Sequence, residues 1–241
     1  MNGNRSEFPV GINLFGSMRR MSMALGVSDL DEIGDRITAL LQTKPPEGMI
    51  AKLAMLPRLL EVAKFPPRRQ SGAAACQEVV WREAEVDLGR LPLMKCWPED
   101  GGAYITVPMV ITRDPRRGIR NVGMYRVMQT GRNTLAMHWQ RHKVGAGHWR
   151  EMAERGETMP VCIAIGADPP SMYSASAPLP PTIDEFLFAG FLRKSPVMLT
   201  KALTCDLELP AEAAFVLEGY IDPRDALVTE GPFGHHTRLY S

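Results

Sequence analysis

Residues 121–126 read Asn-Val-Gly-Met-Tyr-Arg, and this stretch decides how the rest of the chain is interpreted. It places an amide, a glycine and a guanidinium in one short run. Because glycine has no Cβ, a ligand can come close to its backbone. We therefore interpret the stretch as a candidate binding segment for a phosphorylated group.

Two later segments carry the same kinds of chemical group. Residues 138–143 read His-Trp-Gln-Arg-His-Lys, and residues 230–237 read Glu-Gly-Pro-Phe-Gly-His-His-Thr. They add imidazoles, a carboxylate and further glycines. The three segments together give the chain the donors and acceptors of an enzyme site.

Composition restricts the other classes of function. The chain has 241 residues, with 28 Lys and Arg against 27 Asp and Glu, so it lacks the basic field that binding to nucleic acid requires. The four cysteines show no CxxC pairing, which argues against a zinc knuckle or a disulfide framework and favours a reducing cytoplasm. No long apolar run follows the N-terminus, so we expect neither a signal peptide nor a membrane span.

The hydrophobic pattern changes near residue 70. Before this point it predicts a strand over residues 8–15 and an extended linker at 65–69, with helices over 17–26, from Ser28 to before Pro45, and over 48–63. Beyond it, a turn at 114–118 and short β-rich runs are typical of a β-barrel or β-sandwich. The predicted strands are 78–85, 104–112, 121–129, 160–165, 196–205 and 215–221. One helix, over residues 182–192, interrupts these strands, with Thr182 and Glu185 as a capping box.

The three segments, in this order, resemble the UbiD family of decarboxylases, which work with a prenylated flavin mononucleotide (prenylated FMN). The resemblance covers nearly the whole chain. It implies an α+β fold, in which an N-terminal α/β segment (residues 1–70) precedes a split β-barrel flavin-binding domain (residues 71–241). The family also has a segment before the expected first strand and a C-terminal α/β domain. Neither is in this sequence, so we expect a chain truncated at both ends.

The resemblance assigns a metal site to Asn121, His142 and Glu185, which in the family hold a divalent cation against the flavin phosphate. An amide oxygen, an imidazole and a carboxylate, completed by phosphate oxygens, suit Mn²⁺ or Mg²⁺ better than zinc. Each residue alone has a simpler interpretation, as a turn residue, a surface or core histidine, and half of a capping box. Their combination, with Gly123 and Arg126 in register, favours the metal site.

The same resemblance assigns the flavin contacts to two segments and one loop. The segment residues are Met124, Tyr125, Arg126, His138, Trp139, Gln140, Lys143 and Val144. The loop, residues 174–177, contributes Ser176, and in the family it also holds a potassium ion. Trp139 alone would more often be a core residue, so the assignment belongs to its segment rather than to its side chain.

Catalysis in the family uses an arginine, a glutamate and a second acid over the flavin ring. Arg126 and Glu230 match the first two, and the planar guanidinium suits a substrate carboxylate. The second acid falls here on His235, which departs from the family pattern. A histidine can donate the proton that must follow the loss of CO₂. Alternatively, the position has diverged and the chain is catalytically silent.

The function implied by the resemblance is non-oxidative decarboxylation of an aromatic or α,β-unsaturated acid. The sequence resembles the branch that decarboxylates 3-polyprenyl-4-hydroxybenzoate in ubiquinone synthesis more than it resembles the fungal cinnamate branch. The implied partners are that acid, which can be membrane-embedded, a flavin prenyltransferase that supplies the cofactor, and further copies in a homo-oligomer. We expect a cytoplasmic protein, peripheral to the membrane where its substrate is a lipid. Two alternatives stay open: a silent flavin-binding scaffold, and a flavin oxidoreductase on a split barrel, which matches no motif.

Overall fold

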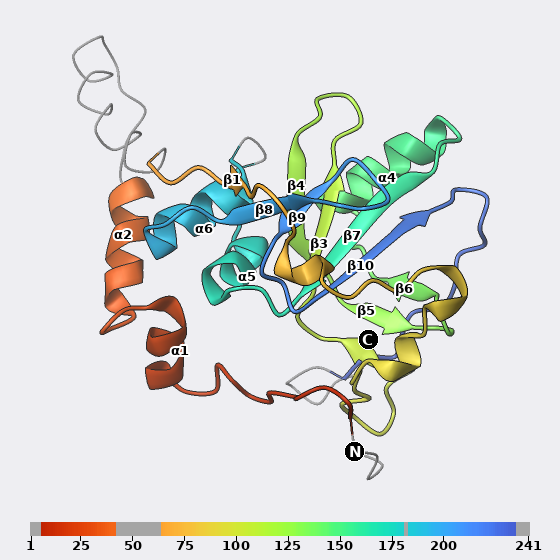
Figure 1. The fold of residues 1–241 in the computed structure, drawn as a ribbon, viewed down its shortest axis with the longest axis horizontal. Helices are drawn as coiled ribbons and strands as arrows, with labels where there is room; N and C mark the ends of the chain where they lie inside the picture. The colour runs from red at the N-terminus through yellow and green to blue at the C-terminus, as the bar shows by residue number, and fades with distance from the viewer. Residues whose placement is uncertain (1–5, 42–63, 181–182, 235–241) are drawn as a thin grey trace.

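The computed structural model describes residues 6–41, 64–180 and 183–234 and shows a mixed α+β protein (Figure 1). The predicted fold class is therefore confirmed. The described residues form three small sheets, and none of the three closes into a barrel.

The central sheet is antiparallel and has four strands in the order β10-β7-β3-β4. They are β3 (Met109–Arg113), β4 (Arg120–Met124), β7 (Met159–Ile165) and β10 (Phe215–Ile221). Successive side chains of a strand point to opposite faces of a sheet. Met109 and Ile111 accordingly lie in one buried hydrophobic cluster, and Val110 lies in another. The core of the protein therefore occupies both faces of this sheet.

Two smaller sheets flank the central one. The first is antiparallel and contains β2 (Tyr104–Ile105), β5 (Val127–Gln129) and β6 (Leu135–Met137). The second contains β1 (Arg68–Arg69), which runs parallel to β8 (Met198–Lys201), and β9 (Glu208–Pro210). The strands predicted over residues 104–112 and 121–129 each divide in two, because the chain passes from one sheet to another within them. Arg126 lies at one of these crossings, between β4 and β5.

Helices cover the two faces of the central sheet. They are α4 (Val144–Glu154), α5 (Pro169–Ser176) and α6 (Glu185–Arg193). Phe186 of α6 belongs to the cluster that contains Met109, whereas Met152 of α4 packs against the cluster that contains Val110. Helices α5 and α6 therefore lie on one face and α4 on the other (Figure 1). Within the described ranges, no helix is long and apolar enough to cross a bilayer.

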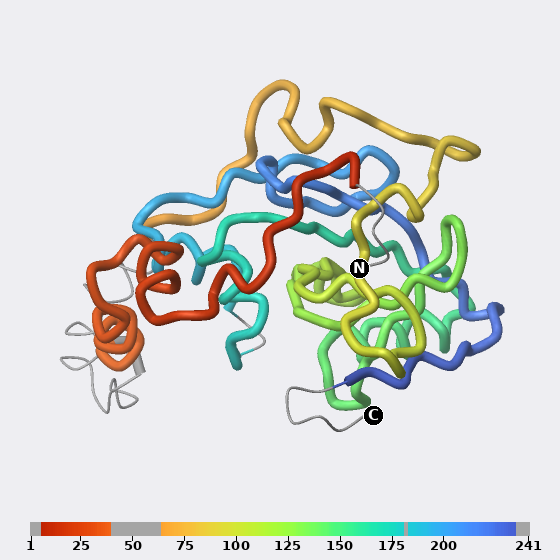
Figure 2. Tube along the Cα trace, turned by 90° about the horizontal axis from the view of Figure 1, so that it is seen from below, coloured from red at the N-terminus to blue at the C-terminus, as the bar shows by residue number. Residues whose placement is uncertain are grey.

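The N-terminal region contributes α1 (Met18–Leu25) and α2 (Asp31–Leu41). Ser17 caps α1, which ends at Gly26 with a φ of 66°, so the predicted helix is confirmed. Figure 2 shows the extended segment that precedes α1 crossing from these helices to the sheets. There the ring of Phe8 meets that of Phe215 edge-on, with centroids 4.9 Å apart.

Two predicted strands are wrong. Residues 8–15 are extended and then turn, but pair with no neighbouring strand in the described part of the chain. Their apolar residues Val10, Ile12 and Leu14 are exposed, so the apolar pattern of this segment does not correspond to a paired strand. Residues 78–85 form turns and a short 3-10 helix. The helix predicted over residues 48–63 lies outside the described residues.

The sequence also missed two helices and misplaced one boundary. The expectation of a single helix among the strands overlooked α4, whose glycines weaken its apolar pattern, and α5, which begins with two prolines after Asp168. Residues 174–177, expected to be a loop, are mostly the last turn of α5. Helix α6 begins only at Glu185, and its cap is Asp184 rather than Thr182, which lies outside the described residues.

Candidate functional site

Arg126 and Glu230 form a buried ion pair where β4 passes into β5. The Nε atom of Arg126 lies 2.9 and 3.0 Å from the two carboxylate oxygens, and Nη2 lies 2.7 Å from Oε2. The two side chains are 15% and 7% exposed. A two-point contact between a guanidinium and a carboxylate fixes the orientation of both groups. The structure thus brings together two residues that the sequence assigned to catalysis.

Three ring side chains surround this ion pair. His138 Nδ1 lies 3.0 Å from Glu230 Oε2, and the Cζ atom of Arg126 lies 4.9 Å from the centroid of the Phe233 ring. Phe233 in turn meets Tyr104 edge-on at 4.7 Å. Burial and the nearby Glu230 carboxylate raise the pKa of Tyr104 to about 12. Its phenol therefore stays protonated, as a hydrogen-bond donor, at neutral pH.

The loop before β2 holds the segment that carries Glu230. Buried Asp100 accepts a hydrogen bond from the backbone N–H of Gly234, with N and Oδ1 2.8 Å apart. A Cβ atom on Gly101 would lie 2.1 Å from the carbonyl oxygen of Gly231, so only glycine permits this close approach. The backbone around the carboxylate is therefore fixed. His235, the residue assigned as the second acid, lies outside the described residues.

A second group of polar residues lies at the start of β4. Asn121 stands opposite Thr112 in the β3–β4 pair, and its Nδ2 donates to Thr112 Oγ1 at 3.3 Å. The same Oγ1 lies 3.0 Å from Nδ1 of His148 in α4, and all three side chains are buried. Because the amide nitrogen is used in this bond, Oδ1 is the atom that a cation would contact.

Glu185, the first residue of α6, lies against β4 at the residue that follows Asn121. Burial raises the pKa of Glu185 to about 7, although backbone hydrogen bonds at Glu185 and Val122 act in the opposite direction. Its Oε2 atom is buried and has no hydrogen-bond partner among the described residues. A buried carboxylate oxygen without a partner is costly, and a bound cation would satisfy it.

An ion pair fixes β4 against the start of α6. Arg120 Nη2 lies 2.5 Å from Asp184 Oδ2, and the Asp184 side chain also caps α6. Arg120 precedes Asn121 in the sequence, just as Asp184 precedes Glu185. The pair therefore holds these two predicted metal ligands at the same edge of the sheet.

His142, the third predicted ligand, is exposed in the turn before α4. In the described part of the chain, no group of three or more His, Cys, Asp or Glu residues is arranged to hold a metal. The predicted set contains only two residues of these types, so this finding does not test it. The structure therefore brings the Glu185 carboxylate to the backbone of Val122, next to Asn121 in β4, and leaves His142 at the surface.

Tyr125, in the first predicted flavin segment, contacts Trp139 of the second. Its ring meets that of Trp139 edge-on at 5.9 Å, and its hydroxyl accepts a hydrogen bond from Gly145 N at 3.4 Å. A Cβ atom on Gly123 would lie 2.3 Å from the Tyr125 ring. The glycine therefore makes room for this ring, a role that the sequence did not suggest. Trp139 Nε1 is buried without a hydrogen-bond partner among the described residues.

The other predicted flavin residues lie in two places. Gln140, Lys143 and Val144 are exposed at the start of α4. Met124 and Ser176 line a mostly apolar cavity of about 170 Å³ between α1 and α5. The N-terminal region supplies part of its wall, through Phe15, Met21, Ala24 and Leu25.

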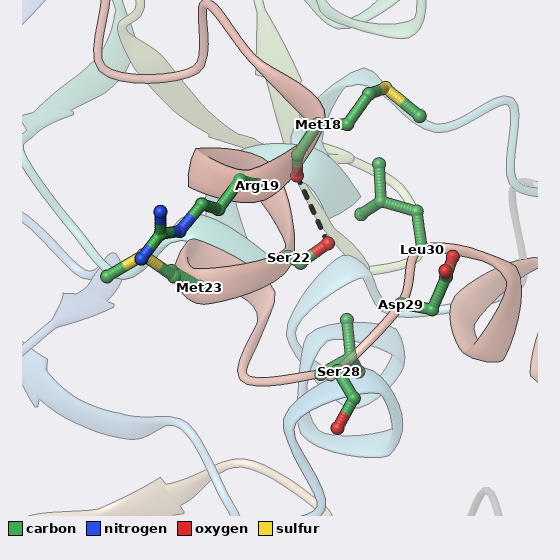
Figure 3. A pocket seen from close by; sticks show the side chains of 8 residues that line it. Met18, Arg19, Ser22, Met23, Ser28, Asp29 and Leu30 are labelled. Atoms are coloured by element: carbon green, nitrogen blue, oxygen red, sulfur yellow. Dashed lines mark hydrogen bonds between the residues drawn. The ribbon is translucent and has the colours of Figure 1, made fainter.

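A separate hollow of about 360 Å³ lies at the turn from α1 to α2 (Figure 3). Ser22 Oγ donates to the carbonyl oxygen of Met18 at 3.1 Å in its wall. The lining residues are Met18, Arg19, Ser22, Met23, Val27, Ser28, Asp29 and Leu30. None of them is a predicted site residue, so this hollow is distinct from the candidate site.

Comparison with protein families identifies the chain. The family model described as the 3-octaprenyl-4-hydroxybenzoate carboxy-lyase Rift-related domain matches residues 68–241. The chain belongs to the UbiD family. The N-terminal domain of the same carboxy-lyase matches residues 2–37 of this UbiD chain, and the resemblance inferred from the three sequence segments is confirmed.

Individual relatives give the same result. An uncharacterized protein of Aquifex aeolicus is 46% identical over 235 residues, which are 98% of this chain and 48% of the relative. Vanillic acid decarboxylase of Sedimentibacter hydroxybenzoicus, in its closed form, is 28% identical with a TM-score of 0.81, over 99% of this chain and 48% of that one. An evolved dimeric form of the UbiD-class enzyme HmfF from Pelotomaculum thermopropionicum, in complex with prenylated FMN, is 29% identical with a TM-score of 0.77, over 94% and 48%. The UbiD chain thus spans about half the length of these relatives.

Three residues next to the Arg126–Glu230 ion pair or to Asn121 were not predicted from the sequence. The sequence could have indicated Thr112, because a turn at 114–118 places residue 112 opposite residue 121 in the hairpin. Tyr104 and His148 carried no local signal. They reach their partners through contacts between distant parts of the chain, which a single sequence does not reveal.

Proposed function

We propose that this UbiD chain carries out the non-oxidative decarboxylation of an aromatic or α,β-unsaturated carboxylic acid. The observation that carries the proposal is the buried ion pair of Arg126 and Glu230, with contacts of 2.7 to 3.0 Å. Glu230 orients the guanidinium, and a guanidinium so oriented is suited to bind a substrate carboxylate at two points.

The residues of this pair have separate roles in the proposal. Arg126 binds and orients the substrate carboxylate, while Glu230 and the 3.0 Å contact from His138 hold the cluster in place. The low exposure of the pair keeps water from competing for these hydrogen bonds. The carbon that loses CO₂ must then receive a proton, and we assign this step to His235 from its place in the sequence.

We propose prenylated FMN as the cofactor, with its phosphate held by Mn²⁺ or Mg²⁺. Asn121, His142 and Glu185 would supply an amide oxygen, an imidazole and a carboxylate to the cation, a donor set that fits either metal. The partnerless oxygen of Glu185 supports this assignment. When bound, the prenylated flavin supplies the electron sink that the loss of CO₂ requires. Residues 174–177, at the C-terminal end of α5, are the proposed place of a potassium ion.

Two classes of substrate are supported to different degrees. The name of the matching family model supports 3-polyprenyl-4-hydroxybenzoate and a role in ubiquinone synthesis. Similarity to vanillic acid decarboxylase supports a smaller phenolic acid. We further propose a cytoplasmic homo-oligomer that receives its cofactor from a flavin prenyltransferase. A domain boundary near residue 70 is consistent with the family match that begins at residue 68.

The full chain, coexpressed with a flavin prenyltransferase, tests these proposals. Mass spectrometry of the copurified cofactor should show prenylated FMN. Incubation with vanillate and with 3-polyprenyl-4-hydroxybenzoate should release CO₂ from one of them and exchange product hydrogen with solvent deuterium. Bound prenylated FMN without either reaction would favour the silent scaffold, and oxidation of NAD(P)H would favour an oxidoreductase.

Substitution of His235 separates an active enzyme from a scaffold. If His235 is the general acid, His235→Ala should lower the rate by about 10² to 10⁴, and His235→Asp should shift the pH profile toward the pKa of a carboxyl group. Equal rates for the parent and both variants, each with cofactor bound, would remove His235 from proton transfer.

A further inference from the structure

We infer that Thr112 and His148 position the side-chain amide of Asn121 so that its oxygen, rather than its nitrogen, faces the cation. The inference rests on the proposed role of Asn121 as a metal ligand. The three residues come from β4, β3 and α4, and they are 6%, 0% and 8% exposed, respectively, for Asn121, Thr112 and His148. They form a buried relay of hydrogen bonds behind the ligand.

The need for such a relay follows from the chemistry of the amide. Its oxygen and nitrogen ends have nearly the same shape, but only the oxygen has lone pairs to bind a cation. An asparagine reversed about its last bond would direct N–H groups at the metal. A buried asparagine ligand therefore depends on a neighbour that distinguishes its two ends.

Thr112 makes this distinction through its single hydroxyl hydrogen. Its Oγ1 lies 3.3 Å from Asn121 Nδ2 and 3.0 Å from His148 Nδ1. If the hydroxyl donates to His148, it can only accept from Asn121, which must then present its nitrogen. If it donated to Asn121 instead, the amide would be reversed. The direction of the bond between Thr112 and His148 therefore sets the orientation of the ligand.

The state of His148 decides that direction. Burial lowers the pKa of His148, although Asp114 and Glu151 act in the opposite sense, so burial favours the neutral ring. With its hydrogen on Nε2, a neutral ring offers Nδ1 as an acceptor. The threonine hydroxyl then donates to His148, and the Asn121 amide donates to the threonine. Both hydrogens gain partners, as buried polar groups require.

Titration of Mn²⁺ into the full chain, with FMN present to supply the phosphate, measures this positioning by electron paramagnetic resonance. Thr112→Val keeps the side-chain shape and removes the hydroxyl, so Mn²⁺ affinity should fall by about 10- to 100-fold, the usual effect of losing a partner of a metal ligand. Thr112→Ser restores the hydroxyl and should bind Mn²⁺ as the parent does.

Thr200→Val is the matched control. Thr200 is a buried threonine of β8, 6% exposed, whose Oγ1 donates to Gln77 Oε1 at 3.3 Å. Its substitution removes the same hydroxyl from another sheet and should leave Mn²⁺ affinity unchanged. Parental affinity in Thr112→Val, or an equal loss in Thr112→Val and Thr200→Val, would overturn the relay. Parental affinity in Asn121→Ala would overturn the ligand assignment itself, and the relay with it.

Nitrogen-15 NMR of the imidazole of His148 in the parent protein provides a second test. It depends on neither a metal nor a variant that must fold. The expected spectrum is that of a neutral ring protonated at Nε2. A ring protonated at Nδ1 would direct the hydrogen bond toward Thr112 and contradict the proposed orientation of the relay.

Discussion

The polar groups at the two ends of β4 differ in how far the protein satisfies their charges. At one end, both oxygens of Glu230 are bonded to Arg126, and His138 lies 3.0 Å from one of them. At the other, Oε2 of Glu185 is buried with no hydrogen-bond partner in the described part of the chain, and burial raises the pKa of Glu185 to about 7.

Glu230 and Arg126 are thus oriented by the fold alone, whereas the carboxylate of Glu185 still has an oxygen to which a cation could bind. A carboxylate that is fully paired in the fold stabilises the folded state and keeps its partner oriented without help. A buried carboxylate with one oxygen unpaired among the described residues opposes folding until a cation binds. Removing the negative charge should therefore have opposite effects on stability at the two ends of the strand.

The largest loss of stability is expected from Glu230→Gln. The variant leaves the guanidinium of Arg126 buried without its counter-charge, so the free energy of unfolding at neutral pH should fall by about 3–5 kcal/mol. Chemical denaturation measures this change. Asp206→Asn, in an ion pair of Asp206 with Arg113 at the surface, is the control and should lose much less. Equal losses in the two variants would show that the buried pair is not special.

The next largest effect concerns activity rather than stability. Arg126→Lys keeps the positive charge but loses the planar fork, so kcat/KM for decarboxylation should fall by about 10²- to 10³-fold. Mn²⁺ affinity, measured separately, should stay at the parental value because the proposed metal ligand Asn121 lies at the other end of β4. Near-parental turnover would remove Arg126 from substrate binding, and a parallel loss of Mn²⁺ would show that the two groups are not independent.

The opposite sign is expected for Glu185→Gln in the metal-free protein. The pKa of Glu185 in the folded protein, about 7, lies above the ordinary value of 4.5. Above pH 7 the folded state carries a buried charge, and the variant should be more stable than the parent by about 1–3 kcal/mol. The advantage should fade as pH falls from 7 to 4.5, because Glu185 of the folded parent becomes protonated over this range, and below pH 4.5 Glu185 of the unfolded parent is protonated as well.

Thermal unfolding of both proteins at pH 8 and pH 4.5 tests this sign. The same variant should lose Mn²⁺, since an amide replaces the carboxylate ligand. If the Glu185→Gln variant were less stable than the parent at pH 8, the carboxylate would already have a favourable partner in the metal-free protein.

The smallest expected effect is the pH dependence of cation binding in the parent. A divalent cation must displace the proton of Glu185, so its affinity should fall by about tenfold for each pH unit below 7. Isothermal titration in buffers of different ionisation enthalpy should show a proton released at pH 6 and little release at pH 8. Affinity that does not change between pH 6 and pH 8 would exclude Glu185 as a ligand.

Local patterns predicted the parts of the fold that depend on neighbours in the sequence. Apolar residues at helical spacing predicted α1, which Ser17 and Gly26 cap, and the turn at 114–118 joins a true hairpin. The exposed run at 8–15 alternates like a strand but pairs with no other strand in the described part of the chain. Helix α5 was not predicted because it begins with two prolines, a residue type that is also common in loops.

The residues of the candidate site likewise include some that local sequence patterns predict and some that only the fold reveals. The stretch at 121–126 was recognisable because its groups are close together in the sequence, and the meeting of Arg126 with Glu230 followed from a family resemblance rather than from any local pattern. Burial decides the rest. Both oxygens of Glu230 are paired, whereas Oε2 of Glu185 has no hydrogen-bond partner among the described residues, and only the fold reveals this difference.

The sequence distance between Arg126 and Glu230 has a consequence for biosynthesis. The two residues are 104 positions apart, so the pair closes only after the ribosome has released the chain beyond Glu230. The strands that surround Arg126 are synthesised well before that moment, and contacts between distant positions form slowly because loop closure must come first. During synthesis there is therefore a stage at which Arg126 has been made but Glu230 has not. A chaperone that binds the nascent chain at this stage binds it before the ion pair can form.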